Sequence, residues 1–195
     1  AYLKWLQGMD LLIRGQKEGN ALARRMFEDA IRSDPDWAQP YFLLGWTYLM
    51  ESLTGSSSSF ESSFDEAINL GRKSLTMDGS LPGPHGLMSQ IYLYKRQHEE
   101  AIAEAEQAVA LAPSLAFAYE WLGSALMFAG RPHEAVRFLE KAIRLNPFPP
   151  AYWIRNLGEA YRLTKQYKEA VTEFKRAIQA NPRYLECHVS MACTY

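Results

Sequence analysis

The chain has 195 residues, of which 48 % are hydrophobic and 22 % are charged, with a formal net charge of −1 at pH 7. This apolar content can form a sizeable core, which excludes a disordered chain. The longest apolar run is too short for a membrane-spanning helix, and the near-neutral charge argues against a nucleic-acid-binding protein. Two cysteines are too few for a disulfide framework, and no secretory signal opens the chain, so we expect a cytoplasmic protein. Because the first residue is Ala and not Met, we expect a longer parent protein.

Short motifs recur along the sequence at nearly constant intervals. Asn146-Pro147 returns as Asn181-Pro182, 35 residues later, and Leu122-Gly123 returns as Leu157-Gly158. A period of this length is typical of stacked helical repeats. The motifs divide the chain into repeats 1–37, 38–81, 82–115, 116–150 and 151–184, with a partial repeat at 185–195. The second repeat carries a Ser- and Gly-rich insertion at about 51–63, which we expect to be a surface loop.

Each repeat predicts two helices joined by a short turn. In the repeat 151–184, apolar residues recur at steps of three and four residues over the first half, and the pattern resumes from Tyr167 to Ala180. Asn181-Pro182 then ends the second helix, because proline lacks an N–H donor and disfavours helix in the residue before it. Small residues such as Gly158 and Ala170 would allow the two helices to approach closely. The fold class is therefore all-α.

The order of an aromatic residue, Leu-Gly, Tyr, Ala, Phe, Ala and Pro resembles the tetratricopeptide repeat, most completely in AYWIRNLGEAYRLTKQYKEAVTEFKRAIQANP. The resemblance implies a right-handed α-solenoid of antiparallel helix pairs that acts as a non-catalytic scaffold for protein–protein interaction. Two repeats depart from the pattern. Ala105 replaces an aromatic residue in the third, and Gly71, Ser74 and Gly79 replace an aromatic residue, Ala and Pro in the second, where we expect looser packing.

In proteins of this family the first helices of the pairs line a concave groove, which would bind a peptide or protein partner. We expect a hydrophobic pocket in this groove, walled by Phe42, Trp46 and Phe117 in front of the small Gly83. The positions assigned to the groove by the resemblance are Tyr2, Trp5, Met9, Phe42, Trp46, Leu49, Gln90, Leu93, Phe117, Glu120, Met127, Tyr152, Arg155, Glu159 and Arg162.

Nothing in the sequence predicts an enzyme, a cofactor or a metal site. The four histidines lie in different repeats without partners at metal-ligand spacing. Cys187 and Cys193 fit no redox motif, and no Gly-rich phosphate loop is present. Residues 131–195 carry 11 Lys and Arg against 6 Asp and Glu, and we interpret their outward-facing cations as a solvated face.

The segments 1–35 and 144–171 are similar to the repeat region that follows class III adenylate or guanylate cyclase domains in many bacteria. This second resemblance implies a regulatory or oligomerisation segment of a signalling enzyme, whose catalytic domain lies outside the chain. Three functions stay open: a protein-binding scaffold, an oligomerisation module that forms homo-oligomers through an uncapped apolar end, and a sensor of small molecules or lipids that uses the apolar half of the groove.

Overall fold

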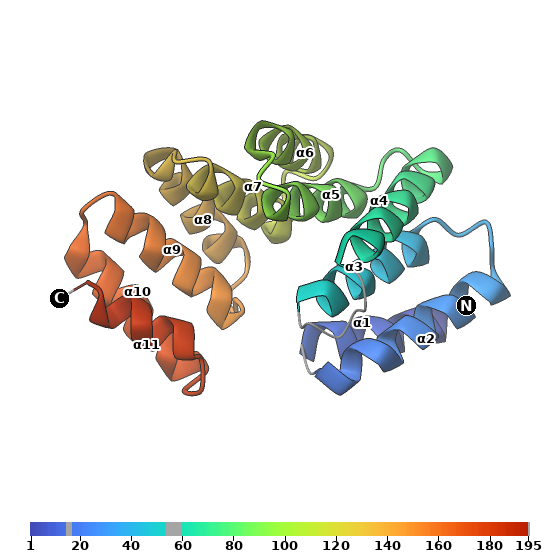
Figure 1. Ribbon diagram of the computed structural model, residues 1–195, viewed down its shortest axis with the longest axis horizontal. Helices are drawn as coiled ribbons and strands as arrows, with labels where there is room; N and C mark the ends of the chain where they lie inside the picture. Colours follow the sequence, from blue (N-terminus) through green and yellow to red (C-terminus); the bar gives the residue numbers. More distant parts are fainter. Residues whose placement is uncertain (15–16, 54–59, 195) are drawn as a thin grey trace. The chain divides into compact units, whose positions relative to one another are not determined.

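The computed structural model describes residues 1–14, 17–53 and 60–194, and these residues form α-helices without any β-strand (Figure 1). Contacts divide the chain into two compact units, Ala1–Ile91 (unit 1) and Tyr92–Tyr195 (unit 2). None of the helices in the described ranges combines the length and apolarity required to cross a bilayer. The helices are α1 (Tyr2–Arg14), α2 (Lys17–Ser33), α3 (Gln39–Leu53), α4 (Phe60–Met77), α5 (Pro82–Tyr94), α6 (His98–Leu111), α7 (Ala116–Phe128), α8 (Pro132–Leu145), α9 (Ala151–Leu163), α10 (Tyr167–Ala180) and α11 (Leu185–Ala192).

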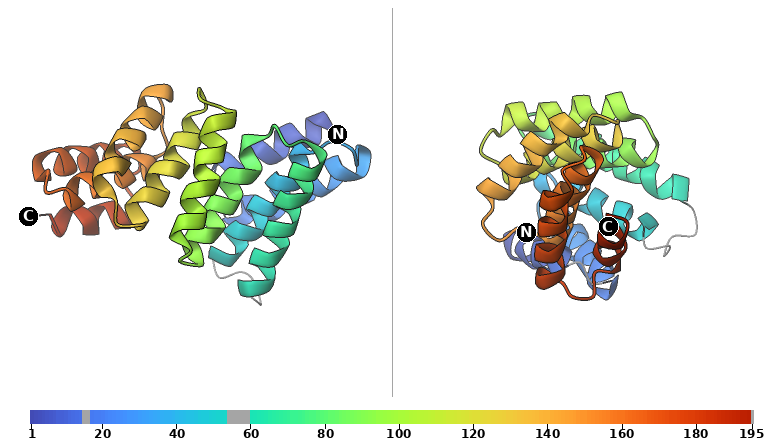
Figure 2. Two further views of the ribbon diagram at one scale, coloured as in Figure 1. Left: turned by 90° about the horizontal axis from the view of Figure 1, so that it is seen from above. Right: turned by 90° about the vertical axis from the view of Figure 1, so that its left-hand side faces the viewer.

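Within each unit the helices are arranged as antiparallel pairs. In unit 1, α1 packs on α2 and α3 packs on α4, whereas in unit 2, α7 packs on α8 and α9 packs on α10 (Figure 2). Each pair packs on the next within its unit, through α2 and α3, α8 and α9, and α10 and α11. The predicted all-α solenoid fold is confirmed, and α10 begins and ends at the predicted Tyr167 and Ala180.

In α1, α7 and α9, a glycine allows a large side chain of the paired second helix to pack against the backbone of the first helix. A Cβ atom placed on Gly158 would lie 2.6 Å from Cε1 of Phe174, and one on Gly123 would lie 2.6 Å from Cγ of Leu139. Real Cβ atoms do not come so close to other heavy atoms. These glycines therefore set the separation of the paired helices, as the sequence predicted.

The second repeat is not loosely packed, contrary to the expectation from its unusual residues. Leu87 of α5 is fully buried, and its Cδ2 lies 3.5 Å from the position of a Cβ on Gly71 and 2.6 Å from that of a Cβ on Gly45. A side chain from the next helix therefore fills the space left by the missing aromatic residue. Ser74 is also fully buried, and its hydroxyl donates a 2.9 Å hydrogen bond to the carbonyl of Ala38.

Three turns that follow first helices share one backbone conformation. Arg96, Gly130 and Lys165 have φ values of 59°, 78° and 63°, which lie in the left-handed region. In the last of these turns, the N–H of the next residue, Gln166, donates to the carbonyl of Tyr161 at 2.8 Å. This hydrogen bond across the left-handed residue is typical of a helix C-terminus that ends in a tight turn.

The predicted insertion at 51–63 is shorter than expected. Helix α3 continues to Leu53 and α4 begins at Phe60, so both ends of the predicted loop are helical. Ser52 is buried in α3, and its hydroxyl donates to the carbonyl of Tyr48 at 3.2 Å, so this end of the predicted loop is part of the packed helix. The central part of the prediction, residues 54–59, lies outside the described residues.

Candidate functional site

The first helices of unit 2, α7 and α9, present corresponding residues side by side. Because the repeat is 35 residues long at this point, each groove position of α7 has a counterpart on α9. The pairs are Phe117 with Tyr152, Glu120 with Arg155, Ser124 with Glu159, and Met127 with Arg162. We call these eight residues and Asn156 the inner face of unit 2.

Aromatic side chains form the part of the inner face nearest the helix N-termini. Phe117 and Tyr152 are 37 % and 40 % exposed, whereas Trp153 between them is fully buried. The Phe117 ring packs edge-on against Trp153 at a centroid distance of 4.8 Å, and Tyr152 meets the same indole at 6.3 Å. The buried indole thus supports two partly exposed rings, and rigid exposed rings are favourable contacts for a bound partner.

A buried carboxylate lies one turn further along α7. Glu120 is 3 % exposed, and its Oε1 accepts hydrogen bonds from the Ser124 hydroxyl at 2.7 Å and from Nδ2 of Asn156 at 3.1 Å. Nδ2 of Asn156 also lies 3.0 Å from the Ser124 hydroxyl oxygen, so the three side chains form a closed network between α7 and α9. Burial raises the pKa of Glu120 to about 7, against the opposing effect of these hydrogen bonds. The carboxyl group is therefore partly protonated near neutral pH.

Arg155 carries a positive charge beside this network. One terminal nitrogen of its guanidinium donates to Oδ1 of Asn156 at 2.8 Å, and Cζ lies 6.0 Å from the ring centroid of Tyr184. Its Nε is buried without a hydrogen-bond partner among the described residues. No carboxylate of the described residues forms an ion pair with Arg155, and the residue is only half-buried. A guanidinium in this state has unused capacity to bind an acceptor oxygen.

The remaining predicted residues of the inner face do not all present side chains to a partner. The sequence predicted that Met127 and Glu120 would be exposed in the groove. Both are buried in α7 instead. Glu159 and Arg162 are both partly exposed, and they form an ion pair with each other at 2.9 Å. Their mutual pairing satisfies the charges that were expected to meet a ligand.

The groove residues predicted in unit 1 pack largely into its core. Leu49 is fully buried, and Phe42 and Trp46 pack against the two core clusters of the unit. The expected cavity in front of Gly83 is not found, because a Cβ there would lie 2.4 Å from the Phe42 ring. That ring occupies the space that the missing side chain leaves. Phe117 belongs to unit 2, where its ring packs on Trp153.

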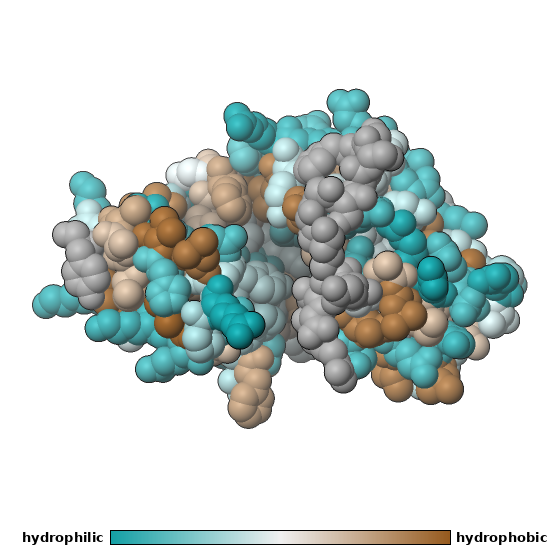
Figure 3. Space-filling model, turned by 60° about the horizontal axis from the view of Figure 1, so that its bottom comes forward, coloured by the Kyte–Doolittle hydropathy of each residue, from teal (hydrophilic) through white to brown (hydrophobic). Residues whose placement is uncertain are grey.

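The other predicted residues of unit 1 and the start of unit 2 differ in exposure. Tyr2 is exposed on α1, and its ring stacks on Trp5 at 5.5 Å, while Met9 packs on the core of unit 1. Gln90 of unit 1 and Leu93 of unit 2 are half-buried on α5. Figure 3 shows apolar side chains at the surface over α1 and α2 and over α9 to α11.

Sequence reasoning missed Asn156, which connects the network to Arg155. A signal was present, because Asn156 is a polar residue on the buried side of an amphipathic helix, next to Leu157 and Trp153. Such a residue needs hydrogen-bond partners inside the protein. Among the described residues, no group of three or more His, Cys, Asp or Glu side chains is placed to hold a metal ion.

Comparisons with known proteins agree with this architecture. A family model described as tetratricopeptide repeat matches residues 87–150 and 122–184. The chain is 27 % identical over 150 residues to anaphase-promoting complex subunit 6 of Arabidopsis thaliana, and 27 % identical over 108 residues to tetratricopeptide repeat protein 37 of Xenopus laevis. These matches cover 72 % and 52 % of the chain but only 27 % and 7 % of the two relatives.

Solved structures of low sequence identity share the fold. TTC0263, a thermophilic TPR protein of Thermus thermophilus, superposes with a TM-score of 0.77 at 20 % identity and covers 99 % of this chain and 97 % of its own. YrrB, a TPR protein with an unusual peptide-binding site, superposes with a TM-score of 0.58 at 20 % identity over 87 % of this chain and 81 % of its own. The chain belongs to the tetratricopeptide repeat family.

Proposed function

We propose that the inner face of unit 2 binds a segment of a partner protein. Proteins of this repeat family generally mediate protein–protein interactions, and the fold is of a non-catalytic scaffold kind. The observation that carries the proposal is Arg155, a half-buried guanidinium without a carboxylate partner in the described part of the chain, beside the exposed rings of Phe117 and Tyr152. A charged hydrogen-bond donor beside rigid aromatic rings is the combination found at the energetic centres of protein interfaces.

The chemistry of the inner face favours a segment that carries both a carboxylate and an apolar side chain. Arg155 would receive the carboxylate through the N–H groups of its terminal nitrogens, because it is half-buried and no carboxylate of the described residues pairs with it. Glu120 would not cancel this charge completely, because its pKa of about 7 leaves it partly neutral. Phe117 and Tyr152 would receive the apolar side chain.

Peptide selection tests the proposal even while the natural partner is unidentified. A phage-displayed library of random peptides is selected on the full chain, and enriched peptides are synthesised and titrated by fluorescence anisotropy. We expect Arg155→Gln and Tyr152→Ala each to weaken binding about tenfold or more. The controls on α10, Lys175→Gln and Tyr167→Ala, remove a positive charge and a tyrosine ring from exposed positions and should leave affinity within about twofold. Equal losses in the controls, or enrichment of no peptide, would contradict the proposal.

An oligomerisation module is the second candidate function. Helix α11 exposes two apolar side chains, Leu185 at 71 % and Val189 at 55 %, separated by one helical turn. Exposed apolar side chains in one stripe favour contact with another protein surface, here a second copy of the chain. Light scattering coupled to size-exclusion chromatography would then give a dimer mass that Leu185→Glu reduces to a monomer. A monomer mass for the unmodified chain contradicts this candidate.

The parent protein is the remaining part of the proposal. The similarity of 1–35 and 144–171 to repeat regions beside cyclase domains supports a bacterial signalling protein of the cytoplasm. The free thiols of Cys187 and Cys193 agree with a reducing compartment. Sequencing of the DNA upstream of the chain tests this, and an upstream reading frame without a nucleotide cyclase domain contradicts it.

A further inference from the structure

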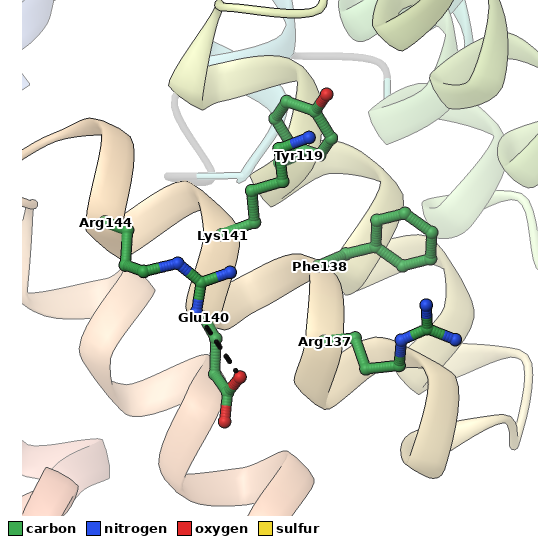
Figure 4. A pocket seen from close by; sticks show the side chains of 6 residues that line it. All are labelled: Tyr119, Arg137, Phe138, Glu140, Lys141 and Arg144. Carbon is green, nitrogen blue, oxygen red and sulfur yellow. Dashed lines mark ion pairs between the residues drawn. The ribbon is translucent and has the colours of Figure 1, made fainter.

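The outer helix α8 borders a cavity on the surface of unit 2 (Figure 4). The cavity has a volume of about 320 Å³. Its lining consists of three cations, one carboxylate and two aromatic rings, namely Arg137, Lys141, Arg144, Glu140, Phe138 and Tyr119. It is formed mainly by second-helix side chains and does not include the inner-face positions described above.

One cation of the cavity, Lys141, is held in place by an aromatic ring while its N–H donors stay available. The Lys141 ammonium lies 4.1 Å from the ring centroid of Tyr119, which leaves its N–H groups to other acceptors. The Tyr119 ring in turn stacks on Phe138, and its hydroxyl donates to the Pro113 carbonyl at 2.9 Å. The rings of Tyr119 and Phe138, which we call the aromatic floor of the cavity, therefore hold the Lys141 ammonium in place.

The single carboxylate does not neutralise this charge. Glu140 pairs with Arg144 at 3.6 Å and accepts a 2.8 Å hydrogen bond from the Tyr161 hydroxyl. Arg137 is exposed, and it forms no ion pair with any carboxylate in the described part of the chain. Three cations against one carboxylate leave an excess of two positive charges around the cavity.

The other repeats show which parts of this arrangement recur and which combination of residues is found on α8. In unit 1, Lys73 lies over the ring of Tyr41 at 4.3 Å, at the positions equivalent to Lys141 and Tyr119. The Lys–Tyr pair therefore belongs to the packing of the repeat. The positions equivalent to Arg137 and Arg144 are Arg25 and Arg32 on α2, Asn69 and Thr76 on α4, Ala103 and Ala110 on α6, and Thr172 and Gln179 on α10. Helix α2 carries both arginines but has Asp29 in place of the lysine, so among the described second helices α8 combines the two arginines with a lysine held over a ring.

We propose that the outer face of α8 is a second binding site, which accepts an acidic segment of a partner protein. Two arginines that flank a fixed ammonium match carboxylates spaced along a peptide, and the aromatic floor contacts the aliphatic parts of Asp and Glu side chains. An acidic peptide is favoured over nucleic acid, because the local excess of two positive charges fits a short run of carboxylates, whereas the chain with its net charge of −1 lacks the basic surface that a long polyanion requires. The site extends the scaffold function from the inner face to the opposite helix layer of unit 2.

A labelled hexaglutamate peptide tests this site by fluorescence anisotropy with the full chain. The double variant Arg137→Gln/Arg144→Gln removes the two arginines and keeps the Lys141–Tyr119 pair. The control Lys168→Gln/Lys175→Gln removes the same charge from exposed positions of α10. We expect the first variant to weaken hexaglutamate binding about tenfold and the control to change it by less than about twofold. Circular dichroism and thermal unfolding verify that both variants fold.

Three results would overturn the proposal. One is the absence of saturable hexaglutamate binding to the unmodified chain at low ionic strength. Another is an equal loss in both double variants, which would mean that net charge alone attracts the peptide. The third is a single-stranded hexanucleotide that binds as tightly as hexaglutamate and loses affinity in the Arg137→Gln/Arg144→Gln variant, because the site would then not select an acidic peptide.

Discussion

Asn156 on α9 donates from Nδ2 to Oε1 of the buried Glu120 on α7, over a distance of 3.1 Å. The same amide contacts Arg155 through its oxygen, at 2.8 Å from the guanidinium nitrogen. Asn156 thus lies between a carboxyl group and a cation that form no ion pair with each other. This arrangement keeps the Arg155 charge available at the inner face while the carboxyl group stays hydrogen-bonded.

Asn156→Ala should destabilise unit 2. The substitution removes a donor from Glu120 and leaves the buried carboxyl with the Ser124 hydroxyl alone, which costs on the order of 1–3 kcal/mol. Urea unfolding followed by circular dichroism measures the loss. Gln179→Ala, at an exposed position of α10, is the control and should change the free energy of unfolding by less than about 0.5 kcal/mol. A loss for Asn156→Ala no larger than that of the control would contradict the network.

Glu120 should make stability depend on pH in an unusual direction. The pKa of Glu120 is 4.5 when the side chain is exposed to water, as in the unfolded chain, and about 7 in the folded protein, so folding favours the protonated form. Its contribution is then largest below pH 4.5 and is lost as the pH rises to 7, by about 3 kcal/mol. Glu120→Gln has no such titration. As the pH rises from 4.5 to 7, urea unfolding should show that the free energy of unfolding of Glu120→Gln increases relative to that of the unmodified chain. Free energies that follow parallel pH profiles in the two proteins would contradict the burial of the Glu120 charge.

Gly158→Ala should disturb the α9–α10 pair. The added methyl group would lie 2.6 Å from Cε1 and 2.8 Å from Cδ1 of Phe174, and relieving this contact costs on the order of 1–3 kcal/mol. Gly79→Ala is the matched control, since the nearest atom to its Cβ is the Leu75 carbonyl oxygen at 3.7 Å. Thermal unfolding should show a lower Tm for the first variant and an unchanged or slightly higher Tm for the control. A harmless Gly158→Ala would mean that the helices are not in contact here.

The left-handed turns should respond oppositely to two substitutions. Gly130→Ala introduces a side chain at φ 78° and should destabilise the turn by about 1 kcal/mol, although no described atom lies near the new Cβ. Lys165→Gly relieves the same strain at φ 63° in the next repeat and should stabilise by about 0.5 kcal/mol or more. The two midpoints of urea denaturation should move in opposite directions. Movement in the same direction would exclude backbone strain as the cause.

The fold could be predicted from the sequence because helix limits follow local signals. Residues from Tyr167 to Ala180 show a regular apolar period that ends at Asn181-Pro182, and α10 has those bounds. Local signals could not predict that the space beside Gly71, where the repeat usually has an aromatic residue, is filled by another side chain. Leu87 comes from a different repeat, and only the three-dimensional packing shows that its side chain fills the space.

The candidate site could be predicted in part. Repeat spacing placed Tyr152 and Arg155 on one face of a first helix, and the structure shows both with partial exposure. Spacing does not distinguish an exposed groove position from a buried one, so Glu120 and Leu49 were expected at the surface. The expected cavity at Gly83 failed for a related reason, since a glycine gap is filled when a neighbouring ring such as Phe42 reaches it.

The central claim is that Arg155 binds a carboxylate of the partner segment, and a double-mutant cycle tests it most directly. The strongest selected peptide is titrated with its carboxylate intact or replaced by the amide, against the unmodified chain and against Arg155→Gln. If Arg155 binds the carboxylate, each change alone weakens binding about tenfold and both together weaken it little further, a coupling of about 1.4 kcal/mol. Independent losses that multiply in the double change would show that Arg155 and the carboxylate do not meet.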